Sequence, residues 1–129
     1  MKAVKLLFGG KTHYIAFTGM AMLAINDTFG GATELLEKIE PNTPEALTAL
    51  SAAIAILAEQ GELARRALNY TPERIFESKE FLSCAAPTDI VKMKQAVPQA
   101  ITLGFGREIV DEQEEVDLVL AELNQKKTN

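Results

Sequence analysis

The fold is decided by the segment from residue 43 to residue 68, which reads TPEALTALSAAIAILAEQGELARRAL. Its apolar and small residues recur at spacings of three and four, the period of one face of an α-helix. That face comprises Leu47, Leu50, Ile54, Leu57, Gly61, Ala64 and Leu68. Alanine and isoleucine residues between them make the middle of the helix apolar all round, which is typical of a central, buried helix. A partner-binding groove would show the same pattern, but a core is its more common source.

The ends of this helix carry recognisable signals. Thr43 suits the N-cap, and Pro44 suits the first helical position. The helix is expected to stop at residues 69–72, which read NYTP, because a residue before proline disfavours the helical backbone. Gly61 and Ala64 lack bulky side chains, so we expect a neighbouring helix to approach closely there.

Two short apolar runs lie near the N-terminus. Residues 2–8 and 13–17 are expected to form strands around the turn Gly9-Gly10-Lys11-Thr12, which predicts a β-hairpin. A lone hairpin is only marginally stable in water, so it must pack on the helices or pair with another chain. Its edge is therefore a candidate surface for self-association.

Two helices are expected between the hairpin and the central helix. Thr18 would cap the first, which runs to Phe29 and ends at the glycine pair of residues 30–31, where a left-handed residue is easily accommodated. A shorter helix is expected over residues 33–40. Its buried side would be formed by Leu35, Leu36 and Ile39.

The chain after the central helix is less regular. One helical turn is predicted at residues 72–76 and another at 78–85. Thr88 would cap the next helix, which Pro98 should kink because proline lacks a backbone donor and crowds the preceding turn. The apolar face of that helix comprises Ile90, Met93, Val97 and Ile101. These elements predict a mainly α (α+β) fold: an N-terminal β-hairpin packed on a bundle of about five helices with a central apolar helix.

The charge is concentrated at the C-terminal end. Residues 107–129 hold seven acids and three bases, a net charge of −4, whereas the whole chain carries −5. This asymmetry predicts a globular domain over residues 1–106 and an acidic extension over residues 107–129 that serves for interaction. Residues 111–125 are expected to form a last amphipathic helix. Its apolar set would be Val116, Leu118, Val119, Leu120 and Leu123.

The composition argues against several classes of protein. Six Phe, two Tyr and no Trp, together with a negative net charge, disfavour nucleic-acid binding, which needs a basic face and stacking platforms. One cysteine cannot form an internal disulfide and fits a reducing compartment. The short apolar run at residues 3–8 does not resemble a secretory signal, and no uninterrupted apolar run approaches the length of a membrane span. We therefore expect a cytoplasmic protein without a membrane association.

No catalytic constellation is visible in the sequence. Gly10-Lys11-Thr12 lacks the earlier glycine of a phosphate-binding loop and is followed by a strand pattern. His13 and Cys84 are single, so a protein-built zinc site is not expected, and the apolar surroundings of Cys84 predict a small buried side chain. The carboxylates of residues 111–115 lack the pattern of a calcium loop. We expect no enzymatic activity, no metal and no cofactor.

Several segments together resemble small prophage-encoded tail assembly chaperones of long-tailed phages. These segments are Lys5–Tyr14, Leu57–Arg66, Lys94–Ile101 and Gly104–Glu108, followed by the acidic end before Gln125-Lys126-Lys127. The resemblance implies a non-enzymatic protein that binds the tape-measure protein, keeps it soluble and helps to recruit tail-tube subunits. It also implies a second, longer product made by ribosomal frameshifting. Residues 125–127 are compatible with this, because their codons can contain the slippery run A AAA AAG.

Exposed apolar side chains would provide the contact with such a partner. The candidates are Met20, Met22, Leu23, Val116, Leu120 and Leu123, since methionine adapts well to varied apolar partners. A homo-oligomer is also compatible with the open hairpin edge. Two alternatives stay open: another small phage protein retained in the virion, such as a tail-completion or connector component, and a small enzyme.

Overall fold

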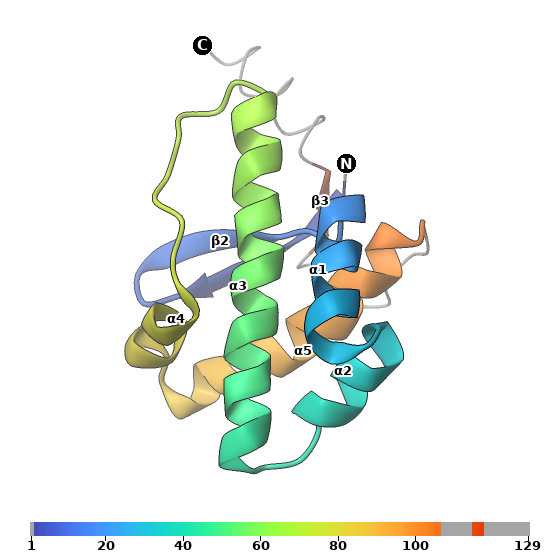
Figure 1. The fold of residues 1–129 in the computed structure, drawn as a ribbon. Coiled ribbons are helices and arrows are strands. Elements are labelled where there is room, and N and C mark those ends of the chain that lie inside the picture. Colours follow the sequence, from blue (N-terminus) through green and yellow to red (C-terminus); the bar gives the residue numbers. More distant parts are fainter. Residues whose placement is uncertain (1, 107–114, 118–129) are drawn as a thin grey trace.

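The computed structural model describes residues 2–106 and the backbone of residues 115–117. Within these residues an N-terminal β-hairpin packs on five helices (Figure 1), as the sequence predicts. The elements in chain order are β1 (Lys2–Phe8), β2 (Lys11–Ile15), α1 (Gly19–Phe29), α2 (Ala32–Ile39), α3 (Pro44–Ala67), α4 (Ser78–Cys84), α5 (Pro87–Gly104) and β3 (Glu115–Asp117).

The hairpin turn is tighter than the sequence suggests. Gly9 and Gly10 alone form it, with φ angles of 59° and 73°, a conformation that glycine adopts without steric cost. Lys11 consequently pairs with Phe8. Strand β2 therefore begins at Lys11, two residues before the expected start at His13.

A third strand replaces part of the expected last helix. Residues Glu115–Asp117 pair antiparallel with Lys2–Val4, so the sheet has the order β2-β1-β3. The prediction of a helix over residues 111–125 is thus wrong at these three positions, and its other residues lie outside the described part of the chain. The Glu-Val-Asp alternation fits a strand, and the register places Lys2 opposite Asp117. Strand β3 also covers one end of the β1 edge that was expected to be open.

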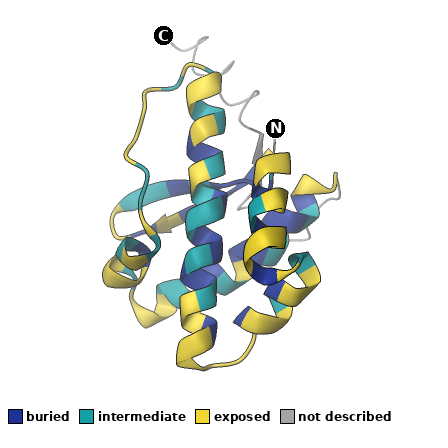
Figure 2. Cartoon of the chain, viewed as in Figure 1, coloured by how far each residue is buried: buried dark blue, intermediate teal, exposed yellow. Residues whose placement is uncertain are grey.

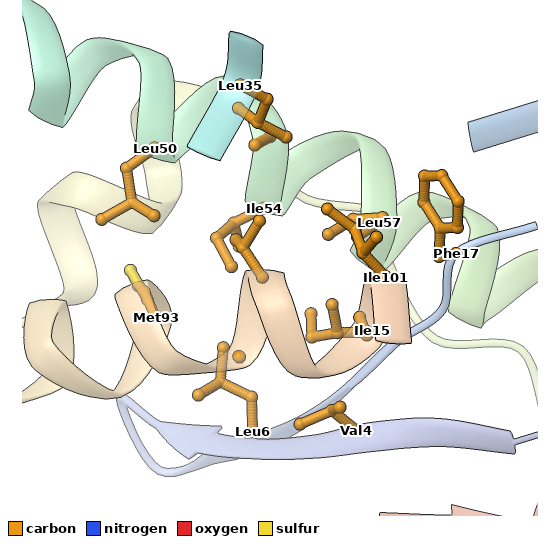
Figure 3. Packing of buried hydrophobic residues seen from close by; sticks show 14 of the residues in the cluster. Val4, Leu6, Ile15, Phe17, Leu35, Leu50, Ile54, Leu57, Met93 and Ile101 are labelled. Carbon is orange, nitrogen blue, oxygen red and sulfur yellow. The ribbon is translucent and has the colours of Figure 1, made fainter. Parts of the chain in front are cut away.

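Helix α3 is the centre of the molecule. It stands across the sheet and contacts β2 and the other four helices (Figure 1). Leu50, Ile54 and Leu57 on this helix have no exposed surface and meet side chains from the hairpin and α5 (Figure 3). The expectation that the apolar face of α3 forms the core is confirmed at these positions.

Gly61 allows a close approach, but by a strand and not by the helix that was expected. A Cβ atom on Gly61 would lie 1.7 Å from the backbone oxygen of Tyr14 in β2, so no side chain fits there without a shift of the strand. Nearby, the backbone N–H of Ala16 donates a hydrogen bond of 3.1 Å to the oxygen of Leu57. The hairpin is thereby attached directly to the backbone of α3.

Two of the three predicted threonine N-caps are found in the structure. Thr18 and Thr43 accept hydrogen bonds of 3.1 Å from Ala21 and Ala46, which confirms both as N-caps. Helix α5 begins one residue before Thr88, however, and its cap position is Ala86. Proline is preferred at the first helical position, and the adjacent Asp89 carboxylate accepts the Ala86 N–H at 2.8 Å.

Two further expectations concern irregular segments. Residues 72–76 do not form a helical turn, since the chain from Tyr70 to Glu77 has no regular secondary structure and runs as a long extended connection from α3 to α4 (Figure 1). Helix α5 continues on both sides of Pro98.

Helix α3 is long and apolar enough to cross a membrane by length and composition alone, a test that the core helix of a soluble protein also passes.

Candidate partner-binding surfaces

The single histidine packs in an aromatic cluster. The His13 ring stacks on Phe8 at 4.7 Å between centroids and lies 5.0 Å and 5.2 Å from Phe76 and Phe81. Its Nε2 atom is buried without a hydrogen-bond partner among the described residues. Burial, and secondarily the charge of Lys11, lower the pKa of His13 from 6.5 to about 4. The imidazole is therefore neutral at physiological pH.

The single cysteine is exposed, so the expectation of a buried Cys84 is wrong. It is the last residue of α4, and the chain that approaches it is the hairpin turn at Gly9. Since glycine has no side chain, nothing from that residue covers the thiol. Gly10-Lys11-Thr12 leads into strand β2, and this agrees with a hairpin turn instead of a phosphate-binding loop.

A buried carboxylate holds the extended segment of residues 70–77 against α3. Glu62 accepts hydrogen bonds from Arg65, from Arg66 Nε at 3.0 Å and from the backbone N–H of Glu73 at 2.7 Å. The same arginines donate to the backbone oxygens of Thr71 and Glu73. Burial raises the pKa of Glu62, but these hydrogen bonds outweigh it and the pKa lies below its ordinary value. We regard this network as structural, because each polar group in it is paired.

The described residues contain no group of three or more His, Cys, Asp or Glu side chains that could hold a metal ion. The carboxylates of residues 111–114 lie outside the described part of the chain. Exposed apolar surfaces are the next candidates for a functional role.

One such surface lies on α1 and contains three of the predicted contact residues. Met20, Met22 and Leu23 are 64%, 39% and 57% exposed, and the outer face of α1 is open to solvent (Figure 2). Of the other three predicted contact residues, Val116 takes part in strand β3 through its backbone, and Leu120 and Leu123 lie outside the described residues.

A second surface is concave and was not predicted. It is an open groove of about 660 Å³ between the start of α3, the end of α4 and the start of α5. Its apolar walls are formed by Pro41, Pro44, Leu47, Leu82, Ala85, Pro87, Ile90 and Val91. Leu47, Leu82 and Val91 are 38%, 37% and 56% exposed. The groove thus gathers large apolar side chains that the fold leaves uncovered.

A smaller hollow of about 310 Å³ continues along α5, lined by Leu36, Ile39, Glu40, Lys94 and Pro98. Lys94 belongs to both hollows. Its ammonium group donates hydrogen bonds to the Glu40 backbone oxygen at 2.9 Å and to Asn42 Oδ1 at 3.0 Å, with a longer contact of 3.5 Å to the Pro41 oxygen. We call the two hollows together the α5 groove, with Lys94 at its middle.

The sequence contained part of the signal for the α5 groove. Pro87, Ile90, Val91, Lys94 and Pro98 recur at helical spacings, so they share one face of α5. The predicted apolar face of this helix, from Ile90 to Ile101, lies beside the groove face and shares Ile90 with it. Leu47 was expected in the core because the periodicity of α3 continues through it.

Comparison of the chain with protein families, with curated proteins and with solved structures finds no match.

Proposed function

We propose that this protein is a non-enzymatic tail assembly chaperone, which binds the tape-measure protein of a long-tailed phage and helps to recruit tail-tube subunits around it. The proposal rests on the resemblance of four sequence segments to such chaperones and on the apolar surfaces of the fold. It places the protein in the host cytoplasm during assembly, where it works without a metal or cofactor.

The observation that supports it best is the α5 groove. A monomeric protein rarely leaves a contiguous apolar hollow open, and such hollows commonly serve for binding a protein or ligand. Burying the exposed parts of Leu47, Leu82 and Val91 against a partner would be favourable, because apolar surface leaves water. A chaperone that keeps a long apolar helical protein soluble needs a surface of this kind.

The first test is the nucleotide sequence from codon 120 through the next few hundred bases. The proposal predicts a slippery run over Gln125-Lys126-Lys127 with an overlapping reading frame, and a long helical tape-measure gene downstream. Unrelated neighbouring genes would contradict the proposal. Broken lysine codons without an overlapping frame would remove the longer product only.

The second test is co-expression with the tape-measure protein from the same genome. We expect the tape-measure protein to become soluble and to co-purify with this chain, and we expect purified virions to lack this chain. A tape-measure protein that stays insoluble would contradict a chaperone role. Recovery of the chain from purified virions would favour a tail-completion or connector component.

A further inference from the structure

We propose that the α5 groove is the docking site, and that its occupant is an amphipathic helix of the partner that places a carboxylate beside Lys94 between two apolar anchors. This inference rests on the proposed function, because it takes the tape-measure protein as the source of the helix. It goes further in naming the site, the conformation of the bound segment and the charge that the segment must carry.

The shape of the groove favours a helix. From Pro87 to Pro98 the open face of α5 spans twelve residues, a length of roughly 16 Å at the rise of an α-helix. The two hollows lie on either side of Lys94, so apolar side chains about two turns apart on a partner helix would enter one hollow each. A segment that binds as an added strand would need an unpaired strand edge, and the residues that line both hollows belong to helices and loops. A polyproline segment would need aromatic walls, and none of these lining residues is aromatic.

The charge at the middle of the groove favours a carboxylate. The ammonium group of Lys94 is held by two backbone oxygens and one amide oxygen, all of them neutral acceptors. No ion pair joins Lys94 to a carboxylate within residues 2–106. The longest of its contacts, 3.5 Å to the Pro41 oxygen, is the one that an incoming carboxylate would replace most easily. A carboxylate on the side of the larger hollow, whose walls are mostly apolar, would form a charge-assisted bond with Lys94, whereas Glu40 lines the smaller hollow and would repel it there.

The face of α1 is a weaker candidate for the same helix. Met20, Met22 and Leu23 are exposed side chains of a single helix, so a partner helix would meet them on a convex surface. In the α5 groove a partner would contact the first turn of α3, the end of α4 and one face of α5 at once. A concave site excludes water from the contact more completely.

Three equally exposed apolar residues provide a matched test. Leu7, Leu23 and Val91 are 57%, 57% and 56% exposed and lie on β1, α1 and α5. We would measure the affinity of the full chain and its Leu7→Asp, Leu23→Asp and Val91→Asp variants for the co-expressed tape-measure protein. We expect Val91→Asp to weaken binding at least about tenfold, because it places a charge on the apolar wall of the larger hollow, and the other two to stay within about threefold.

The outcomes separate this inference from the proposed function. Wild-type binding with an effect only in Leu23→Asp would overturn the groove and keep the chaperone. No wild-type binding would overturn both. If Val91→Asp instead dissolved an oligomer of the free protein, measured by light scattering, the occupant would be a second copy of the chain and the proposal would be wrong.

The predicted carboxylate of the partner is tested by a substitution at Lys94, with a substitution at Lys92 as the control. Lys94→Gln should weaken binding about five- to tenfold and reduce its dependence on salt, because a charged partner of the carboxylate is lost. Lys92→Gln removes the same charge from an exposed position of α5 outside the α5 groove and should change affinity less than about twofold. Equal effects of both variants would show a general electrostatic attraction and contradict a carboxylate at the groove centre. The melting temperature of Lys94→Gln distinguishes weaker binding from a damaged fold.

Discussion

Leu57 and Leu47 belong to the same apolar face of α3, yet Leu57 has no exposed surface and Leu47 is 38% exposed. Strand β2 and helix α5 cover the face at the level of Leu57, whereas Leu47 lies in the open α5 groove. Periodicity therefore identifies an apolar face but does not show how far the neighbouring elements cover that face. Where no neighbouring element covers it, the same apolar face is exposed and available to a partner.

The largest contrast between these two places is expected from truncation to alanine. Leu57→Ala should lower the free energy of unfolding by about 2–5 kcal/mol, because it leaves a cavity in the packed core. Leu47→Ala should cost less than about 1 kcal/mol, since its side chain is partly in water already. Urea denaturation of both variants measures the difference. Similar losses at the two sites would mean that Leu47 belongs to the core and that the groove is filled.

A second prediction concerns the contact between α3 and the hairpin. Gly61→Ala should lower the free energy of unfolding by about 3 kcal/mol, at the upper end for overpacked positions, because the new Cβ atom would overlap the Tyr14 oxygen. Glu59→Ala, an exposed position on the same helix, is the control and should be nearly neutral. Thermal unfolding of the two variants is the measurement. A stable Gly61→Ala variant would contradict the close packing of α3 on β2.

The free energy of unfolding should also depend on pH, because His13 is buried in the folded protein. The folded-state pKa of His13 is about 4, below its ordinary value of 6.5, so its contribution to stability is complete above pH 6.5 and is lost as the pH falls from 6.5 towards 4. Between pH 7 and pH 5 this loss should be about 2 kcal/mol. His13→Phe should remove the pH dependence in this window. An unchanged dependence in that variant would assign it to other groups.

A smaller effect is expected where Glu62 holds the extended segment. Glu62→Gln should lower the free energy of unfolding by about 1–2 kcal/mol, because charge-assisted hydrogen bonds become neutral ones. Since the pKa of Glu62 is lowered, its contribution is present above its ordinary value of 4.5 and disappears as the pH falls below it. Hydrogen exchange should speed up in residues 70–77 while α5 keeps its protection. Faster exchange throughout the chain would indicate a role in the core instead.

The smallest effect on stability is expected in the α5 groove itself. Val91→Asp should change the free energy of unfolding by less than about 0.5 kcal/mol, because the residue is 56% exposed in the free protein. Chemical denaturation checks this before any binding experiment. A large loss would show that Val91 is packed in solution, and then the groove would not be open.

Much of the fold could be predicted from local signals. Thr18 and Thr43 could be predicted as N-caps because a threonine hydroxyl can accept a backbone N–H in the first turn of a helix. The periodicity of α3 identified its core residues. The strand at Glu115–Asp117 was missed because a short alternating segment forms a strand only when an open edge, here residues 2–4, is present to receive it. The exposure of Cys84 was missed for a similar reason, because the residue that approaches it is Gly9, which is distant in the sequence and has no side chain to cover the thiol.

The candidate site could be predicted only in part. The exposed side chains of Met20, Met22 and Leu23 follow from the position of α1 at the outside of the bundle. The α5 groove combines three chain segments, at residues 36–47, 82–87 and 90–98, and its existence depends on how α2, α3 and α4 meet α5. No local pattern encodes that arrangement.

The most direct test of the account is hydrogen–deuterium exchange of the chain alone and in complex with the tape-measure protein. If the α5 groove receives a partner helix, exchange should slow in residues 41–47 and 82–98 while α1 is unchanged. Slower exchange in α1 with an unchanged groove, in a complex that demonstrably forms, would contradict it.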